Sequence, residues 1–191
     1  MRAILLFALS ILLSTHVWAL QADALVTAAR EQVGVTLGYD PAYRRLSYPN
    51  GDVPLNTGVC TDVVIRALRQ QGLDLQQAVH QDMRANFRLY PKNWGLSRPD
   101  SNIDHRRVPN LVTWFRRQGW ALALGQDAER YRPGDIVTWD LGGGLIHIGI
   151  ISDRQASSGV PPVLHNIGRG TQEEDILFSF KITGHYRIPA V

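Results

Sequence analysis

The chain contains a single cysteine, Cys60, which stands where a glycine-containing loop gives way to a helical pattern. A helix is predicted to begin at this point because the apolar residues that follow fall on one stripe: Val63, Val64, Ala67 and Leu68. A thiol in the first turn of a helix lies near the positive end of the helix dipole and near unpaired N–H groups, and both favour the thiolate. The position therefore suits a nucleophile, and a buried cysteine that only packs is the alternative.

Residues 1–19 have the pattern of a secretory signal peptide. An arginine precedes an almost wholly apolar run, residues 3–13, and Val17-Trp18-Ala19 places small residues at the usual cleavage positions, with a cut after Ala24 as the alternative. The apolar run is shorter than a membrane span, so we expect a periplasmic or secreted protein without a stable membrane anchor. Exported proteins meet an oxidising compartment, where the lone Cys60 indicates a reactive thiol or an intermolecular bridge.

The composition is that of one ordinary globular domain, residues 20–191. The chain has 191 residues, of which 45% are hydrophobic and 19% charged, and its formal net charge is +3. This length suits one domain with a substantial core and is short for two. No Lys/Arg-rich run is present, so we expect no nucleic-acid partner. The sequence does not determine the oligomeric state.

The order of the predicted elements indicates the fold class. Helical spacing predicts helices near 21–33, 60–71, 74–83 and 109–118. Alternating patterns predict strands near 120–124, 136–139, 145–151, 162–167, 176–180 and 182–188. Helices followed by antiparallel strands imply an α+β domain in which N-terminal helices pack on a C-terminal sheet. Residues 35–58 form a long turn-rich loop before Cys60, and loops of that length are often functional. The sequence does not determine whether this loop is a lid.

Two consecutive predicted strands, 145–151 and 162–167, carry the histidines that could serve a site with Cys60. In the first strand, His147 and Gly149 share one face while the flanking isoleucines share the other, and the glycine leaves room for a group to approach the imidazole. In the next strand, His165 and Asn166 are adjacent and must point to opposite faces. Only one of them can face the same cleft as His147, unless a bulge intervenes.

These motifs, in this order, resemble the papain-like fold and within it the bacterial NlpC-type cell-wall peptidases. The matching features are Cys60 at a helix start, Pro133-Gly134-Asp135 before a strand, the His-x-Gly-Ile run at His147, and His165 in the following strand. The resemblance implies that Cys60 is the nucleophile, that His147 is the base and that His165 orients it. It also places a tyrosine near the oxyanion site about a dozen residues before the cysteine, where Tyr48 stands here.

A closer resemblance covers nearly the whole mature chain. Gly58-Val59-Cys60-Thr61-Asp62 together with Asn102-Ile103-Asp104-His105-Arg106-Arg107 is similar to an exported bacterial family of unassigned function in the same superfamily. The chain departs from the NlpC-type pattern at Asp62, which suits the helix dipole but opposes a thiolate two residues away. Arg106 and Arg107 are the candidates to neutralise it. The 102–107 run could line a cleft or form a salt-bridged loop, and we favour the loop.

The leading hypothesis is therefore a cysteine hydrolase that cleaves amide bonds, with peptidoglycan or another peptide as its substrate. Cys60, His147 and His165 are the candidate catalytic residues, and Tyr48, Asp62 and Asn166 are candidates for the oxyanion site or cleft. Asn166 is also the alternative to His165 as the residue that orients His147. A thioesterase or acyltransferase could use the same Cys–His dyad, and a non-catalytic module could bind cell-wall peptides on the same fold. The sequence has no close pair of metal ligands, so no metal and no cofactor is predicted.

Overall fold

The computed structural model describes residues 20–189; the predicted signal peptide, residues 1–19, lies outside them. Within the described residues, four α-helices precede the main sheet: α1 (Ala22–Arg30), α2 (Cys60–Gln70), α3 (Leu75–Asn86) and α4 (Val108–Arg117). Each matches a helix predicted from apolar spacing. Three short 3-10 helices lie between or after them: η1 (Phe87–Leu89), η2 (Asp104–Arg106) and η3 (Ala128–Arg130).

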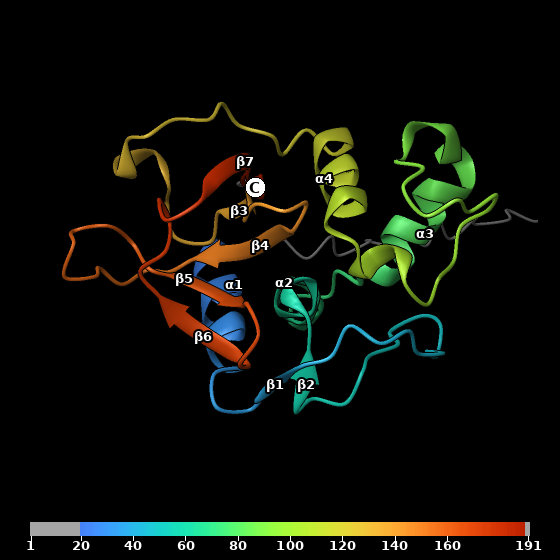
Figure 1. Ribbon diagram of the computed structural model, residues 1–191, viewed down its shortest axis with the longest axis horizontal. Coiled ribbons are helices and arrows are strands. Elements are labelled where there is room, and N and C mark those ends of the chain that lie inside the picture. Colours follow the sequence, from blue (N-terminus) through green and yellow to red (C-terminus); the bar gives the residue numbers. More distant parts are fainter. Residues whose placement is uncertain (1–19, 190–191) are drawn as a thin grey trace, which may run out of the picture.

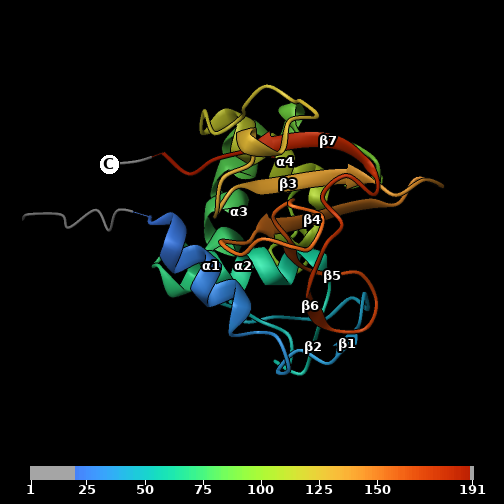
Figure 2. The ribbon, with the colours of Figure 1, turned by 90° about the vertical axis from the view of Figure 1, so that its left-hand side faces the viewer.

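The C-terminal half forms a five-stranded antiparallel sheet (Figure 1). Its strands are β3 (Ile136–Asp140), β4 (Ile146–Ile151), β5 (Val163–Asn166), β6 (Thr171–Glu174) and β7 (Lys181–Tyr186). Their spatial order is β6-β5-β4-β3-β7, which Figure 2 shows from bottom to top. Two short strands, β1 (Gly38–Tyr39) and β2 (Thr57–Gly58), pair in parallel before α2. The predicted α+β class, with N-terminal helices on a C-terminal antiparallel sheet, is confirmed.

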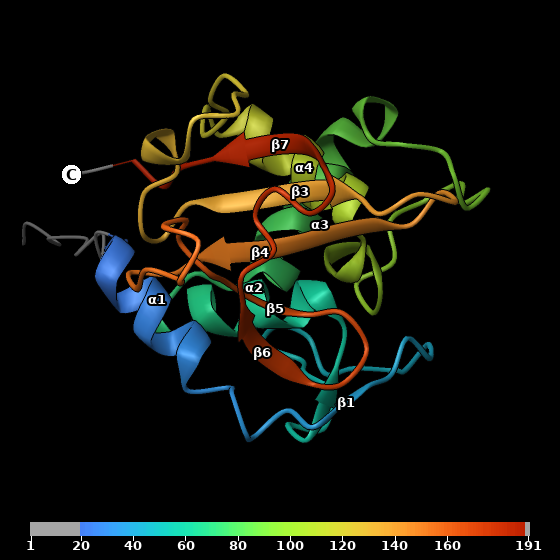
Figure 3. The same ribbon diagram turned by 60° about the vertical axis from the view of Figure 1, so that its left-hand side comes forward.

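The two faces of the main sheet have different coverings. Helices lie behind the sheet in Figure 3, and Ile148, Ile150 and Leu164 pack with the apolar side chains of α1, α2 and α4 in the larger core. The other face carries a smaller cluster around Val137 and Trp139, covered by loop residues such as Leu177 and Phe178. On the helical face, α2 packs most extensively against β4. This packing places the start of α2 at that strand.

Two predictions about strands are wrong, and one edge strand of the main sheet was missed. Residues 120–124 form no strand and contribute only an isolated bridge, from Ala121 to Tyr186. Residues 176–180 also form no strand, because their apolar side chains pack onto the second face of the sheet from a turn. The edge strand β6 was not predicted, since Thr171-Gln172-Glu173-Glu174 is polar throughout and lacks alternation.

Candidate active site

Cys60 is the first residue of α2 and is buried, with 4% of its surface exposed. Its side chain lies in the wall of a cleft of about 570 Å³. The cleft is lined largely by aromatic, apolar and cationic side chains, among them Tyr39, Tyr43, Trp94, Arg107 and Ile146. Because Cys60 begins the helix, its own N–H has no intrahelical acceptor. The cysteine is thus accessible only through a concave, partly apolar site.

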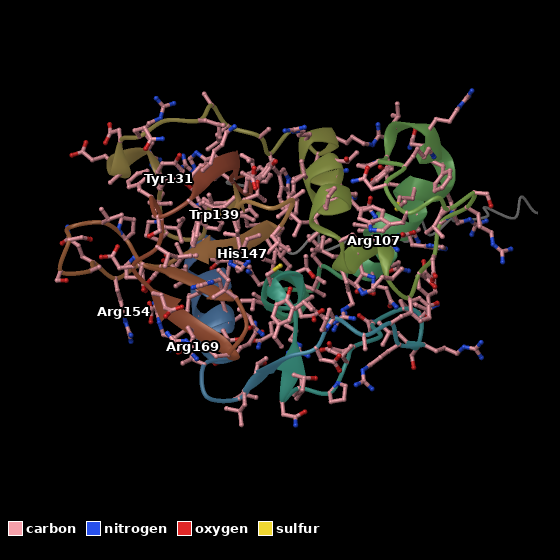
Figure 4. All side chains as sticks on the ribbon, in the orientation of Figure 1. Arg107, Tyr131, Trp139, His147, Arg154 and Arg169 are labelled. Atoms are coloured by element: carbon pink, nitrogen blue, oxygen red, sulfur yellow. The ribbon has the colours of Figure 1, made fainter. Side chains whose placement is uncertain are left out.

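Two buried histidines from neighbouring strands form a hydrogen-bonded pair. Nε2 of His147, on β4, lies 2.9 Å from Nδ1 of His165, on β5. Gly149 makes this approach feasible, since a Cβ at that position would lie 2.5 Å from Val163 Cγ1 and 3.1 Å from His165 Cβ. Trp139 packs against the other side of the His147 ring, with centroids 5.8 Å apart. Figure 4 shows His147 at the centre of the molecule, beside β4.

Asn166, the alternative partner of His147, faces the other way. Its Nδ2 donates to the carbonyl oxygens of Gly38 at 3.1 Å and Gly58 at 3.3 Å, and its Oδ1 accepts from the Gly168 N–H. Asn166 therefore joins the main sheet to the small β1–β2 sheet, and it does not line the cleft. Of the two adjacent side chains, the structure brings His165 to His147.

The thiol and the imidazole are both neutral in the resting protein. Burial raises the pKa of Cys60 to about 11, and the Ile148 and Thr61 N–H groups and the Tyr39 hydroxyl, which face the sulfur, offset this only in part. Burial also lowers the pKa of His147 to about 3. No hydrogen bond joins Cys60 to the His147 ring among the described residues. The expectation that the helix terminus favours a resting thiolate is therefore wrong, because desolvation outweighs it.

Of the two arginines predicted to neutralise Asp62, only Arg106 forms an ion pair with it. Arg106 donates from Nε to Asp62 Oδ1 at 3.0 Å and from Nη2 to Oδ2 at 2.9 Å, and both side chains are buried. Asp62 Oδ2 also accepts the Val59 N–H at 2.6 Å, which caps the start of α2. Arg107 instead pairs with Asp104 at 3.1 Å and lies 4.0 Å above the Trp94 ring. Asp62 thus supports the cysteine's helix, while the 102–107 run is both ion-paired and part of the cleft.

Tyr48 does not lie in the cleft, in contrast to the expectation from the resemblance. Its ring packs edge-on against His80, with centroids 5.2 Å apart, and its side chain is exposed. The tyrosine that faces the Cys60 sulfur is Tyr39, which the sequence did not indicate. Pairing of Tyr39 with Gly58 across β1 and β2 brings it there. A two-residue parallel pairing leaves no periodic signal from which this could be predicted.

The 35–58 segment is anchored to α2 through the buried Arg66. The guanidinium donates from Nε to Asp52 at 2.9 Å, from Nη1 to Thr36 at 3.0 Å, and from Nη2 to the carbonyl oxygen of Thr57 at 3.0 Å. Together with the bonds from Asn166, these contacts hold the segment that supplies Tyr39 to the cleft. The segment is a fixed wall of the site in this structure.

Two absences apply to residues 20–189. No group of three or more His, Cys, Asp or Glu side chains there has the arrangement of a metal site. None of the helices in that range is both long and apolar enough to span a bilayer.

The fold and this arrangement define an α+β protein in which a cysteine begins a helix that packs on one face of β4, while a buried histidine pair lies on the other face of the sheet, against Trp139. The chain belongs to the family described as a domain of unknown function, DUF1287, which matches residues 26–188. It is similar to the uncharacterized protein YijF of Escherichia coli (strain K12), with 58% identity over 164 residues, 86% of this chain and 80% of that protein.

A solved structure, NlpC1 from Trichomonas vaginalis, is also similar, with a TM-score of 0.45 and 15% identity over 91% of this chain. The chain spans about half of that structure's length, 48%.

Proposed function

We propose that this protein is an exported cysteine hydrolase that cleaves amide bonds, with peptidoglycan peptides as its substrate. The observation that carries the proposal is the start of α2, where Cys60 lies in the wall of the cleft and its sulfur faces the Ile148 and Thr61 N–H groups and the Tyr39 hydroxyl. The buried His147–His165 pair, 2.9 Å apart on the neighbouring strands β4 and β5, supplies the candidate base and the ring that orients it. Nucleophilic catalysis by cysteine needs an adjacent base whose ring is oriented by a third group. The predicted signal peptide supports export, and the resemblance to cell-wall peptidases supports the substrate.

The proton moves along a defined route in this mechanism. His147 Nε2 is held by His165, so Nδ1 is the ring nitrogen left to serve as the base. As the Cys60 sulfur bonds to the substrate carbonyl carbon, its proton passes to His147 Nδ1 and the carbonyl π electrons move to oxygen. The intermediate collapses to a thioester, and the imidazolium gives its proton to the leaving amine. Water then hydrolyses the thioester with His147 again acting as the base, which regenerates the thiol.

Because both groups are neutral at rest, the site has to stabilise charge mainly in the transition state. Charge appears on Cys60 and His147 only as the substrate is attacked, and a buried site stabilises that charge if donors are already in place. The Cys60 N–H, at the start of α2, and the Tyr39 hydroxyl, which faces the sulfur, are the candidate donors to the oxyanion.

The test is digestion of purified muropeptides by the wild-type protein and by Cys60→Ala, followed by mass spectrometry of the new amine and carboxyl ends. We expect cleavage by the wild type and none by the variant. The Tyr48→Phe variant is a matched control, because Tyr48 is exposed and outside the cleft. Unchanged cleavage by Cys60→Ala, or none by the wild type, contradicts the proposal. Adding acyl thioester substrates to the assay separates an amidase from a thioesterase or acyltransferase that uses the same dyad.

A second candidate is a module that binds cell-wall peptides without cleaving them. The observation in its favour is the raised pKa of Cys60, together with the lack of a hydrogen bond from the thiol to His147. This function predicts that the wild type pulls down with peptidoglycan sacculi, that Cys60→Ala does so equally well, and that neither releases peptide fragments. The Trp94 side chain lines the cleft, so loss of sacculus binding in Trp94→Ala would place the peptide-binding site in that cleft.

A further inference from the structure

The histidine pair continues to a carboxylate that the proposed mechanism has not used. Glu174, on the edge strand β6, places Oε2 3.1 Å from His165 Nε2, the ring nitrogen opposite the one that meets His147. Glu174 stands opposite Val163, so it is a diagonal neighbour of His165 on the same face of the sheet. Its other oxygen contacts Arg169, which is largely exposed. The chain of groups is therefore His147, His165, Glu174 and Arg169, running from the buried interior of the sheet to the surface.

Among residues 20–189, His165 Nε2 has no acceptor within reach other than this carboxylate. The side chain is fully buried, and Nε2 lacks a hydrogen bond of good geometry even though Glu174 lies at ion-pair distance. Glu174 is a quarter exposed, so its side chain has room for the small rotation that aligns it with the N–H. A buried N–H without an acceptor costs about 1–3 kcal/mol, which favours this alignment whenever Nε2 carries the proton.

The two neutral rings can share their protons in only two ways. If His165 is protonated on Nε2, its Nδ1 accepts from His147 Nε2–H, and His147 Nδ1 is free to act as a base. If His165 is protonated on Nδ1, it donates to His147 Nε2, and the His147 proton then sits on Nδ1, where it prevents catalysis. Burial holds the pKa of both rings below the usual range, so both are neutral at physiological pH. The carboxylate stabilises the first arrangement.

We infer that Glu174 is a positioning residue, one that sets the tautomers of both histidines so that His147 Nδ1 is free to take the Cys60 proton. The inference rests on the proposed function for its catalytic consequence and on the geometry alone for the tautomers. It requires no change of the mechanism: the proton taken from sulfur still ends on His147 Nδ1, and the Nε2–H bond to His165 persists throughout.

Long-range ¹H–¹⁵N correlation spectra of the histidine-labelled exported protein test it directly, with signals assigned through His147→Gln and His165→Gln. In the wild type we expect His147 and His165 both protonated on Nε2. Glu174→Ala should move the proton of His147 to Nδ1 in most molecules and lower kcat for muropeptide cleavage by at least about tenfold with KM unchanged, because only the remaining molecules have a free Nδ1. Glu174→Gln, which keeps an acceptor oxygen, should largely retain the wild-type tautomers. Asp175→Asn is the matched control, since it removes an exposed neighbouring carboxylate.

Two results would overturn the inference: a wild-type His147 protonated on Nδ1, or unchanged tautomers in Glu174→Ala. If Glu174→Ala does not fold, Glu174→Leu keeps the bulk of the side chain and serves instead. A wild-type protein with the expected tautomers and no cleavage contradicts the proposed function while leaving the tautomer assignment standing. Cleavage by the wild type with unchanged tautomers in the variants contradicts this inference alone.

Discussion

The sheet holds two buried histidine centres that differ in their partners. His147, on β4, meets the neutral ring of His165 at 2.9 Å and packs against Trp139. His185, on β7, meets Asp135 at 2.6 Å and stacks on Tyr131, with ring centroids 4.4 Å apart. Both imidazoles are about 2% exposed, so burial does not distinguish them.

The difference lies in charge. Asp135 also binds Arg187 at 2.6 Å, and although burial opposes its ionisation, the bonds from Arg187 and His185 hold the pKa of Asp135 below its usual range. That centre is an ion-paired joint between the start of β3 and the end of β7. Among the described residues, His147 has no charged group in contact with it. His185 Nδ1 is likewise without a hydrogen-bond partner, so the charged partner on Nε2 is what distinguishes the two centres.

Replacing each histidine should separate the two centres most strongly. We expect His147→Ala to lower the rate of muropeptide cleavage about 10²- to 10⁴-fold, the usual contribution of a general base. His185→Ala should leave the rate per folded molecule unchanged and lower the melting temperature. Steady-state kinetics and thermal unfolding of both variants check this. Equal rate losses in both variants would show that the distinction between the centres is wrong.

Removing the charged partner should break the His185 centre. Asp135→Ala leaves Arg187 and the buried His185 without their acceptor, and we expect it to lower the free energy of unfolding by about 3 kcal/mol. Urea unfolding measures this loss, with Asp127→Ala, an exposed carboxylate, as the control. A loss below that of an ordinary surface substitution would contradict an ion-paired joint.

Acid should destabilise the His147 centre. Burial lowers the pKa of His147 to about 3, whereas the unfolded chain binds this proton near pH 6.5, so its contribution to stability is complete above pH 6.5 and is lost as the pH falls toward 3. Burial lowers the pKa of His105 to about 4, which acts in the same direction. We expect His147→Gln to reduce the slope of unfolding free energy against pH by about one proton over this range. Urea unfolding at a series of pH values gives the slope, and an identical slope in the variant would contradict the assignment.

The smallest expected effect concerns the tyrosines. Tyr39→Phe removes a hydroxyl that faces the Cys60 sulfur, and we expect the rate of Cys60 alkylation by iodoacetamide to fall about fivefold, the effect of one hydrogen bond of about 1 kcal/mol. Tyr48→Phe should alkylate at the wild-type rate, because Tyr48 packs against His80 outside the cleft. Mass spectrometry follows the reaction without ambiguity, since the chain has one cysteine. The reverse ranking would restore Tyr48 to the site.

The local features of this protein could be predicted from its amino-acid sequence. Apolar spacing predicted the four helices, including the one that Cys60 begins, because a helix must present one stripe to the core. Strand alternation placed His147 with Gly149, and it showed that His165 and Asn166 face opposite ways, which the contacts of each residue confirm. These features depend on residues that are close together in the sequence, so the pattern of apolar and polar residues is enough to predict them.

Contacts between segments that are distant in the sequence could be seen only in the folded protein. Tyr39 reaches the sulfur through a two-residue pairing with β2, and Glu174 reaches His165 from a polar edge strand that has no apolar alternation. The state of the thiol also follows from the fold, because the helix start that favours thiolate is buried, and desolvation is the larger effect. Hydrogen bonds and desolvation act through space, and their sum at Cys60 is set by segments that the sequence separates by up to a hundred residues.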